Sequence, residues 1–393
     1  PRERGQEKIY NSHLNLWPKA AKEPELMTTS LSPLNSAPTT IGPMERYDYR
    51  LEFQRSSDGK RLDAGRVNPY WLEFLWEQAI FQGQRRGTVG PDPSQAIINE
   101  HPQFLKDPEG SLKSISVSAG DGTNMHETQF ELSAAFSAPG EEALKKLVEG
   151  GLLTAEDKAT FRVYAKPSAK VAEQETNGVR ATLKRDPLPL LDEGCLEDYM
   201  EKATLNGELD EKDHPLFVPR ELFEKAREYC FKTGRQEGGA MIVARMYRQT
   251  EPQPEIFVVA HAVMELRHAK QSLFGFEPTS DTFADLNKQL HLRRSRLGFP
   301  DEMPAVLVHN HPFEPSVRDD GEANCPTCPL QQTCELTSSF YSASDVNFHL
   351  SMYGRQPFVT GVVIGLTPRQ EDDVRMFCLD GTRTRERGFY WLD

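Results

Sequence analysis

The stretch AVLVHNHP at residues 305–312 decides which fold we expect for the second half of this chain. Its four apolar residues predict a buried β-strand, and a proline suits the point where a strand leaves its sheet. Residues i and i+2 of a strand point to the same face, so the imidazole rings of His309 and His311 can bind one metal ion. A third ligand has to come from another segment.

Apolar segments flank this strand on both sides. Upstream, residues 219–234 form a helical pattern that begins with proline and ends with glycine. Glu237 follows at the start of an apolar strand over 238–247. Downstream, residues 342–354 begin with the serine and aspartate typical of a helix start, and an apolar strand follows at 358–366. These segments predict one folded domain over residues 214–393.

Asp345 lies near the start of the predicted helix and is the candidate third ligand. Two histidines, one carboxylate and an open fourth position are typical of a catalytic zinc site, because the open position is left for water. Zinc lowers the pKa of that water, which then becomes a nucleophile near neutral pH. A general base has to lie beside it, and Glu237 is the candidate.

The order of these motifs resembles the JAMM/MPN metalloprotease family over about residues 214–393. The resembling parts are the Glu-Gly-Gly strand at 237–239, the HNHP strand at 309–312 and the Ser-x-x-Asp helix start at 342–345. The resemblance implies a cytidine-deaminase-like α/β/α domain. It also implies a zinc isopeptidase that cleaves after ubiquitin or a ubiquitin-like protein, or that processes related sulfur-carrier proteins.

The same resemblance implies a role for each motif residue. His309, His311 and Asp345 would bind the zinc. Glu237 would take a proton from the zinc-bound water and later protonate the leaving amine. Ser342 would donate a hydrogen bond to the oxyanion of the tetrahedral intermediate. Serine is also a good helix N-cap, and both roles can hold at once.

A long insertion, residues 313–341, separates the HNHP motif from Ser342. A second Ser-x-x-Asp motif, Ser316 to Asp319, is separated from Pro312 by only three residues. This second motif resembles a RadC-like branch of the family. We prefer Ser342 and Asp345, because so few residues leave little chain to turn back onto the metal.

The insertion also contains Cys325, Cys328 and Cys334 in a C-x2-C-x5-C pattern. Clustered thiols in a chain with six cysteines predict a second metal site. A structural zinc is one interpretation and an iron–sulfur cluster another, with unliganded thiols as the third. A structural zinc needs a fourth ligand, for which the candidates are Cys230, Cys378 and His349.

The first half of the chain predicts a smaller α+β domain over residues 44–170. Strand patterns lie at 47–53, 111–118, 126–136 and 160–166, and helical patterns at 69–82 and 141–151. Residues 1–43 are rich in Pro, Ser, Thr and Asn and predict a flexible tail, and 171–213 predict a linker. The domain resembles no family, and recognition of the modifier or a partner is our hypothesis for it.

Charge and composition limit the partners that we expect. The chain of 393 residues has a net charge of −13, which argues against general binding to nucleic acid, because phosphate contacts need positive surface. No apolar run suits a membrane span, and residues 1–22 lack the apolar core of a secretion signal. Clustered cysteines without a disulfide framework favour a reducing compartment, so we expect a cytoplasmic protein.

The sequence therefore predicts a zinc-dependent (iso)peptidase that acts on a ubiquitin-like protein or its conjugate. Two alternatives stay open. One is a non-catalytic MPN scaffold, which the presence of every motif residue disfavours. The other is a RadC-like or iron–sulfur protein associated with nucleic acid, which the cysteines favour and the acidic charge disfavours.

Overall fold

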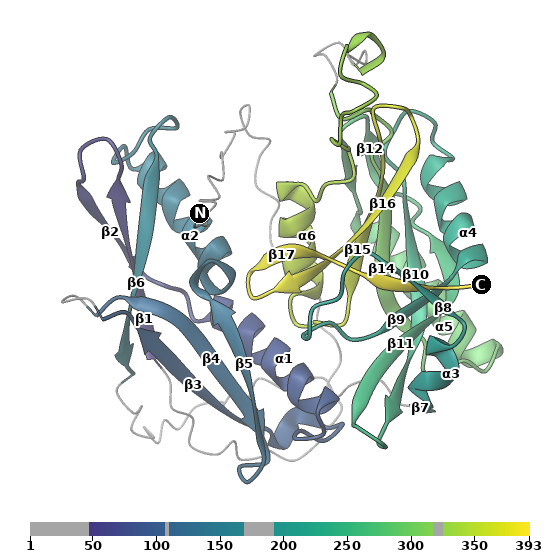
Figure 1. Cartoon of the computed structure of the whole chain (residues 1–393), viewed down its shortest axis with the longest axis horizontal. Coiled ribbons are helices and arrows are strands. Elements are labelled where there is room, and N and C mark those ends of the chain that lie inside the picture. Colours follow the sequence, from purple (N-terminus) through teal and green to yellow (C-terminus); the bar gives the residue numbers. More distant parts are fainter. Residues whose placement is uncertain (1–46, 107–109, 169–191, 317–324) are drawn as a thin grey trace, which may run out of the picture.

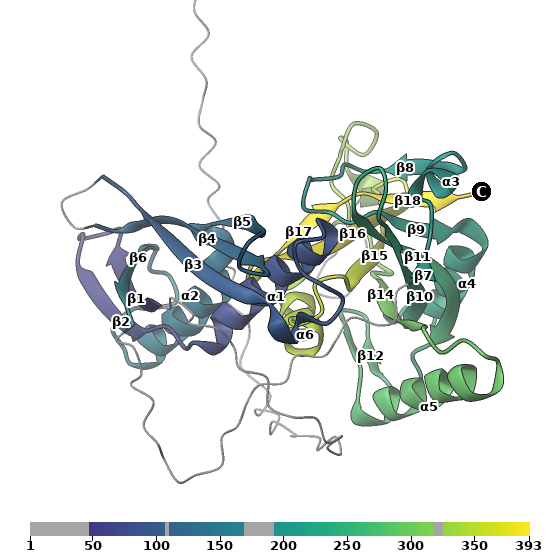
Figure 2. The ribbon, with the colours of Figure 1, turned by 90° about the horizontal axis from the view of Figure 1, so that it is seen from below.

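The computed structural model describes residues 47–106, 110–168, 192–316 and 325–393 (Figure 1). Two folded units lie side by side, one formed by the described residues up to 168 and one by those from 192 onward (Figures 1 and 2). Each has its own hydrophobic core and mixes helices with strands, which confirms the α+β class. The predicted tail 1–43 and the first part of the predicted linker lie outside the described residues.

Two three-stranded antiparallel sheets and two helices form the N-terminal unit. The strands are β1 (Tyr47–Arg55), β2 (Arg61–Arg66), β3 (Ile97–Phe104), β4 (Leu112–Gly120), β5 (Met125–Glu131) and β6 (Ala159–Pro167). Their order is β2-β1-β6 in one sheet and β3-β4-β5 in the other. The helices are α1 (Tyr70–Arg85) and α2 (Leu132–Glu149). Apolar residues from both sheets and both helices meet in one core.

Helix α1 follows the predicted helical pattern, yet it is buried on nearly every face. Pro69 precedes it, where the fixed φ of proline suits a helix start and its missing N–H is not needed. Even Gln78, Gln82 and Arg85 are buried. The reason is its position between the two units (Figure 2).

The segment 126–136 differs from its prediction as a single strand. Strand β5 ends at Glu131, and helix α2 begins at the next residue. The alternation of buried and exposed side chains stops there, and the Leu-Ser-Ala-Ala that follows contains alanine, the residue with the strongest helix preference. Phe136 has non-helical dihedral angles three residues before Pro139, so the helix is kinked at that point.

One large mixed sheet forms the C-terminal unit. Its strands are β7 (Asp192–Glu193), β8 (Ala203–Asn206), β9 (Leu216–Pro219), β10 (Gly239–Gln249), β11 (Glu255–Glu265), β14 (Met303–Asn310), β15 (Thr360–Leu366), β16 (Asp372–Asp380), β17 (Arg383–Arg387) and β18 (Phe389–Leu392). Their order is β17-β16-β15-β14-β10-β11-β9-β18-β8, and β7 pairs with β10. Strand β14 lies between β10, to which it is antiparallel, and β15, to which it is parallel. The HNHP motif therefore lies at the C-terminal end of an interior strand.

Helices α4 (Arg220–Phe231), α5 (Ser280–Arg296) and α6 (Ala343–Tyr353) accompany the sheet, with the hairpin β12 (Lys270–Ser272) and β13 (Gly275–Glu277). Helix α6 begins with a capping box, in which Ser342 and Asp345 each accept a hydrogen bond from the backbone N–H of the other. This cap fixes the direction of the Asp345 carboxylate. None of the helices in the described segments is long and apolar enough to cross a membrane.

Residues 192–213, the second half of the predicted linker, belong instead to the C-terminal unit. Strand β7, helix α3 (Leu196–Met200) and strand β8 lie in this segment. Strand β8 pairs with β18, and the side chains of Leu196 and Tyr199 pack against Phe217 and Phe257. Elements this short contain too few residues for a periodic pattern, which explains why they do not stand out in the sequence.

Buried polar side chains join the two units. At the end of α1, Arg85 pairs with Glu255, with 2.7 Å between Nε and Oε1, and donates to the carbonyl oxygen of Lys212 at 2.6 Å. The Gln78 amide donates to the carbonyl oxygen of Gly381 at 2.8 Å and accepts from its N–H at 2.7 Å. These contacts fix how the units face each other, because unpaired partners would be left buried.

Candidate metal centre

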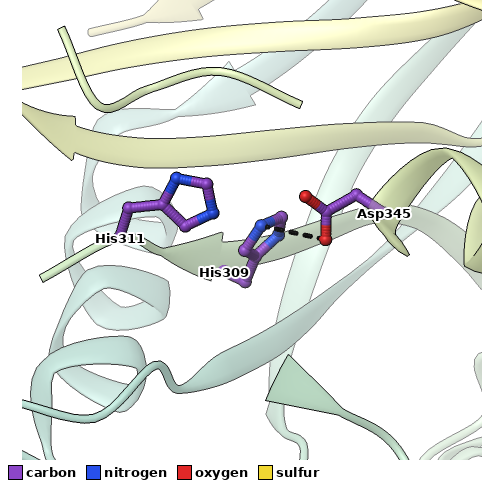
Figure 3. A group of neighbouring side chains, drawn as sticks. All are labelled: His309, His311 and Asp345. Atoms are coloured by element: carbon purple, nitrogen blue, oxygen red, sulfur yellow. Dashed lines mark ion pairs between the residues drawn. The ribbon is translucent and has the colours of Figure 1, made fainter. Parts of the chain in front are cut away.

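His309 and His311 lie at the end of strand β14, inside the large sheet. His309 is in register with Gly239 of β10 on one side and with Val363 of β15 on the other. The backbone N–H of His311 donates to the carbonyl oxygen of Ile364 at 2.9 Å. Both imidazoles are buried and neighbour each other, as the i and i+2 spacing predicts (Figure 3).

Asp345 reaches the two histidines from the first turn of α6 (Figure 3). Its Oδ1 lies 3.4 Å from Nε2 of His309. One ligand atom each from His309, His311 and Asp345 lie within 4.8 Å of one another. Within the described ranges, this is the only group of three or more His, Cys, Asp or Glu side chains close enough to share one ion.

The donor atoms of this cluster fit a zinc ion. Nδ1 of His311 lies 2.6 Å from the carbonyl oxygen of Ser338. A carbonyl oxygen can only accept, so Nδ1 carries the proton and the lone pair of Nε2 is free for a metal. Nε2 of His309 is buried and makes no hydrogen bond. Two imidazole nitrogens and one carboxylate oxygen are a catalytic zinc set.

The ionisable groups of the cluster influence one another. Burial opposes ionisation of Asp345, but His309 and hydrogen bonds from Ser342 hold the pKa of that carboxyl well below its ordinary value. Burial also opposes protonation of His309, yet Asp345 and Glu237 raise the pKa of that imidazole. Burial, and then His309, lower the pKa of His311 to about 4. The cluster therefore favours one positive charge beside Asp345, which a bound cation would supply.

Glu237 lies beside the cluster, just before β10. Its side chain is buried, and its Oε1 lies 3.8 Å from Nε2 of His311. Burial raises the pKa of Glu237 to about 7, while His309 lowers this pKa and Asp345 raises it by smaller amounts. A carboxyl group with such a pKa can accept and release a proton at neutral pH. The structure therefore places the predicted general base next to the candidate metal ligands.

Asn310 holds the Glu237 segment against the histidine strand. Its side-chain Oδ1 accepts a hydrogen bond from the backbone N–H of Gly238 at 2.7 Å, and its backbone N–H donates to the Gly238 carbonyl oxygen at 3.3 Å. Gly238 also lies so close to helix α4 that an added Cβ would be 2.3 Å from the carbonyl oxygen of Cys230. A Cβ added to the second glycine, Gly239, would lie 2.3 Å from Cζ of the Phe276 ring. Both glycines of the motif are thus required by packing.

Ser342 occupies the N-cap of α6 and makes its strongest contact with Asp345. The Ser342 hydroxyl donates to Oδ2 of Asp345 at 2.6 Å. This hydrogen bond leaves Oδ1 of Asp345 toward His309. The capping role is thus visible in the structure, and the oxyanion role stays a prediction. In the competing motif, Asp319 lies outside the described residues.

Aromatic side chains border the cluster, and the sequence reasoning missed them. Phe313 stacks on the His311 ring with 5.1 Å between centroids, and Phe340 approaches the same ring at 4.9 Å. Phe274, from the β12–β13 turn, packs on Phe313 at 5.0 Å. Phe274 and Phe340 are 54% and 49% exposed. The signal in the sequence is that Phe313 follows the HNHP motif directly and Phe340 shortly precedes Ser342.

A hydrogen-bonded pair, the half-buried Tyr341 and the buried His349, lies behind the cluster. The Tyr341 hydroxyl lies 2.9 Å from Nδ1 of His349, and Nε2 of His349 lies 3.2 Å from the carbonyl oxygen of Val359. Nε2 must be the donor to that carbonyl, so Nδ1 accepts from the tyrosine. Both nitrogens of His349 therefore have partners, and this pair links α6 to the segment that leads into β15.

The three cysteines of the insertion do not assemble into a metal-binding group in the described part of the chain. Cys325 is buried, Cys334 is half-buried and Cys328 is exposed. The proposed fourth ligands have other partners: Cys230 contacts the carbonyl oxygen of Val308, and Cys378 contacts Asp213. The second metal site, zinc or iron–sulfur, stays a prediction.

Comparisons with known proteins add little to this geometry. No protein-family model matches the chain, and no curated protein matches it. The solution structure of a protein from Desulfitobacterium hafniense matches with a TM-score of 0.27 and 13% identity, over 44% of this chain and 88% of that one. A likeness of this strength carries no argument about fold or activity.

Proposed function

We propose that this protein is a zinc-dependent (iso)peptidase of the JAMM/MPN type. The observation that carries the proposal is the convergence of three buried side chains and the partly buried Asp345 from three segments. His309, His311 and Asp345 place their ligand atoms within 4.8 Å of one another, and Glu237 lies 3.8 Å from His311. Charged and polar groups are rarely buried together without a partner or a function.

Each residue would have a separate task in hydrolysis. Nε2 of His309, Nε2 of His311 and Oδ1 of Asp345 would hold the ion, with the tautomer of His311 set by the Ser338 carbonyl oxygen. When bound, zinc would polarise a water molecule and lower its pKa. The Ser342 hydroxyl keeps Asp345 oriented.

Glu237 would move the protons. Its carboxylate would take a proton from the attacking water at Oε1 or Oε2 and then give it to the nitrogen of the departing amine. The pKa of about 7, caused by burial, suits both steps. Asn310 and the two glycines hold the backbone of this segment in place. The general base therefore lies on a firm support, which catalysis requires.

The substrate that we propose is the bond after the C-terminus of a ubiquitin-like protein. The motif resemblance is the argument for this substrate class. The exposed rings of Phe274 and Phe340 beside His311 support it further, because they offer an apolar border on which an extended chain can lie. The N-terminal unit is the proposed element that recognises the modifier or its conjugate.

The decisive experiment compares the wild type with Glu237→Gln in two assays. The first measures bound zinc, and the second measures cleavage of isopeptide-linked ubiquitin dimers and of ubiquitin with a fluorogenic C-terminal amide. We expect Glu237→Gln to keep the zinc and to lose about 10²–10⁴-fold in kcat, because only the proton acceptor is removed. The exposed Glu335→Gln serves as the matched control and should cleave like the wild type.

Two outcomes would contradict the proposal in different ways. If the wild type binds no zinc, the metal site itself is wrong. If it binds zinc but cleaves none of these substrates, the peptidase assignment fails and the non-catalytic MPN scaffold becomes the better interpretation. Cleavage that Glu237→Gln leaves unchanged would contradict the role of Glu237 alone.

A further inference from the structure

A small polar cavity lies between the two units, away from the metal cluster. Gln78 and Thr128 of the N-terminal unit line one side. Lys212, His214 and Arg387 of the C-terminal unit are among the residues that line the other. Its volume is about 30 Å³, room for one or two particles of the size of water.

His214 brings an unused hydrogen-bond donor to this cavity. Nη1 of Arg387 lies 3.4 Å from Nδ1 of His214, and an arginine can only donate. Nδ1 is therefore the acceptor, and Nε2 carries the hydrogen of the neutral ring. His214 is only 2% exposed, and its buried Nε2 makes no hydrogen bond within the described part of the chain. Burial, and then the charges of Arg387 and Arg85, lower the pKa of His214, so the ring stays neutral.

Thr128 brings a second unused polar group from the opposite unit. It lies on strand β5, its side chain is 4% exposed, and its Oγ1 has no hydrogen-bond partner. A hydroxyl and an imidazole N–H that are both buried and unpaired each destabilise the folded state, because they lose their hydrogen bonds to water and gain none in return. Two such groups that line one cavity from two sides indicate a hydrogen-bond acceptor between them.

The charges that line the cavity favour an anion as that acceptor. Lys212, Arg385 and Arg387 are three positive charges, and Asp213 and Asp380 are two negative charges, which leaves a net charge of +1. Both carboxylates are already engaged. Asp213 binds Arg385 at 2.7 Å and 3.1 Å, and Asp380 lies 3.4 Å from Nζ of Lys212 and binds Arg383 at 2.9 Å. Nε of Arg387 lies 3.8 Å from Asp213, which already binds Arg385. The positive charge of Arg387 is therefore the one left over in this count.

We propose that this cavity binds one small monovalent anion of the size of chloride, between the His214 imidazole, the Thr128 hydroxyl and the guanidinium of Arg387. The anion would accept a hydrogen from each unit and would neutralise the positive charge buried between them. It would therefore stabilise the interface and have no part in hydrolysis. A cation is disfavoured by the charge, and a larger anion such as sulfate is disfavoured by the volume.

The first test identifies what occupies the cavity. Crystals of the wild-type chain grown or soaked in sodium bromide should show an anomalous difference peak within hydrogen-bond distance of Nε2 of His214 and Oγ1 of Thr128. A water molecule there, with no anomalous signal, overturns the proposal. This measurement needs no variant, so it stays decisive even where substitutions prevent folding.

The second test measures stabilisation by the anion in solution. At constant ionic strength, replacing sodium gluconate by sodium chloride should raise the midpoint of thermal unfolding in a saturable manner. Thr128→Val keeps the shape of the side chain and removes the hydroxyl, so the chloride concentration that gives half of the effect should rise roughly tenfold. The matched control Thr360→Val, in buried strand β15, should respond to chloride like the wild type.

Equal midpoints in the two salts, or an unchanged chloride dependence of Thr128→Val, would contradict the anion site. Both tests are independent of zinc and of any cleavage assay. Their failure therefore leaves the proposed peptidase untouched, and a failure of the peptidase leaves the anion site standing.

Discussion

The metal cluster and the contact between the two units both bury several charged side chains, but they use them differently. Around Arg85, the charged groups are paired with each other: its guanidinium binds Glu255, and the Asp213 carboxylate binds Arg385. In the candidate metal-binding cluster, Nε2 of His309 makes no hydrogen bond, and Oδ1 of Asp345 lies 3.4 Å from it.

This difference separates a structural role from a functional one. Buried charges that satisfy each other hold a structure together, and removal of one partner leaves the other unpaired. Buried polar atoms that aim at one point without a mutual partner indicate a ligand. The cavity beside His214 is where the two patterns meet, because most of its charges are paired and one ring nitrogen is not.

The largest effect that we expect comes from breaking the ion pair between Arg85 and Glu255. Arg85→Met should lower the free energy of unfolding by about 3–5 kcal/mol. It leaves the partly buried Glu255 with only the more distant Arg86, and it removes the donor to the carbonyl oxygens of Lys212 and Asp213. Chemical denaturation followed by circular dichroism measures this loss. The control Lys146→Met breaks an exposed i, i+4 pair with Glu142 and should cost no more than about 0.5 kcal/mol. Equal costs for both variants would show that the interface pair is not special.

Removal of one of the candidate metal ligands tests whether the cluster binds zinc. His311→Ala should weaken zinc binding at the cluster at least about 100-fold, since even the loss of a residue that only supports a ligand commonly costs 10–100-fold. Competition with a chelator of known affinity measures the change. The variant in which Cys325, Cys328 and Cys334 are all serine should keep this zinc. It would lose a second equivalent only if the insertion binds metal. Unchanged affinity in His311→Ala would exclude the cluster as the zinc site.

Asn310, which supports the proposed general base Glu237, provides a smaller effect. Asn310→Ala removes the acceptor for the N–H of Gly238, which should cost about 1–3 kcal/mol of stability. It should also lower kcat while zinc stays bound, because Glu237 loses its fixed position. The exposed Asn347→Ala on α6 is the matched control. A variant that loses stability but keeps its kcat would show that Asn310 supports the fold only.

A further effect of similar size is the pH dependence of stability caused by a buried neutral histidine. Burial lowers the pKa of His349 to about 4, below the value of about 6.5 of an unfolded histidine. Below pH of about 6.5 the unfolded chain therefore binds a proton that the folded chain does not. From there down to about pH 4, stability should fall by up to about 1.4 kcal/mol per pH unit for this group.

Comparison with a variant isolates the contribution of this histidine. His349→Gln should be less stable at pH 7, because its partners Tyr341 and Val359 lose contacts, but its stability should fall less steeply below pH 6.5. Unfolding midpoints measured at several pH values give both slopes. Parallel curves for the variant and the wild type would contradict the assignment.

Much of the fold is predictable because long apolar segments have clear periods. The predicted strand before His309 and the predicted helix after Ser342 both form. The short strands β7, β8 and β18 are not predictable from local patterns, since they depend on pairing with distant segments. The change from strand to helix after Glu131 is missed because both patterns place apolar residues there.

The sequence by itself determined the chemistry of the cluster. The i and i+2 spacing of two histidines on a strand places both rings on one face, and a serine three residues before Asp345 orients its carboxylate by capping a helix. Local geometry is sufficient for both. Only the tertiary structure decided how far the carboxylates of Asp345 and Glu237 lie from the histidines, that aromatic rings border them, and that Arg85 is paired. These contacts join residues far apart in the chain, and no local pattern encodes such distances.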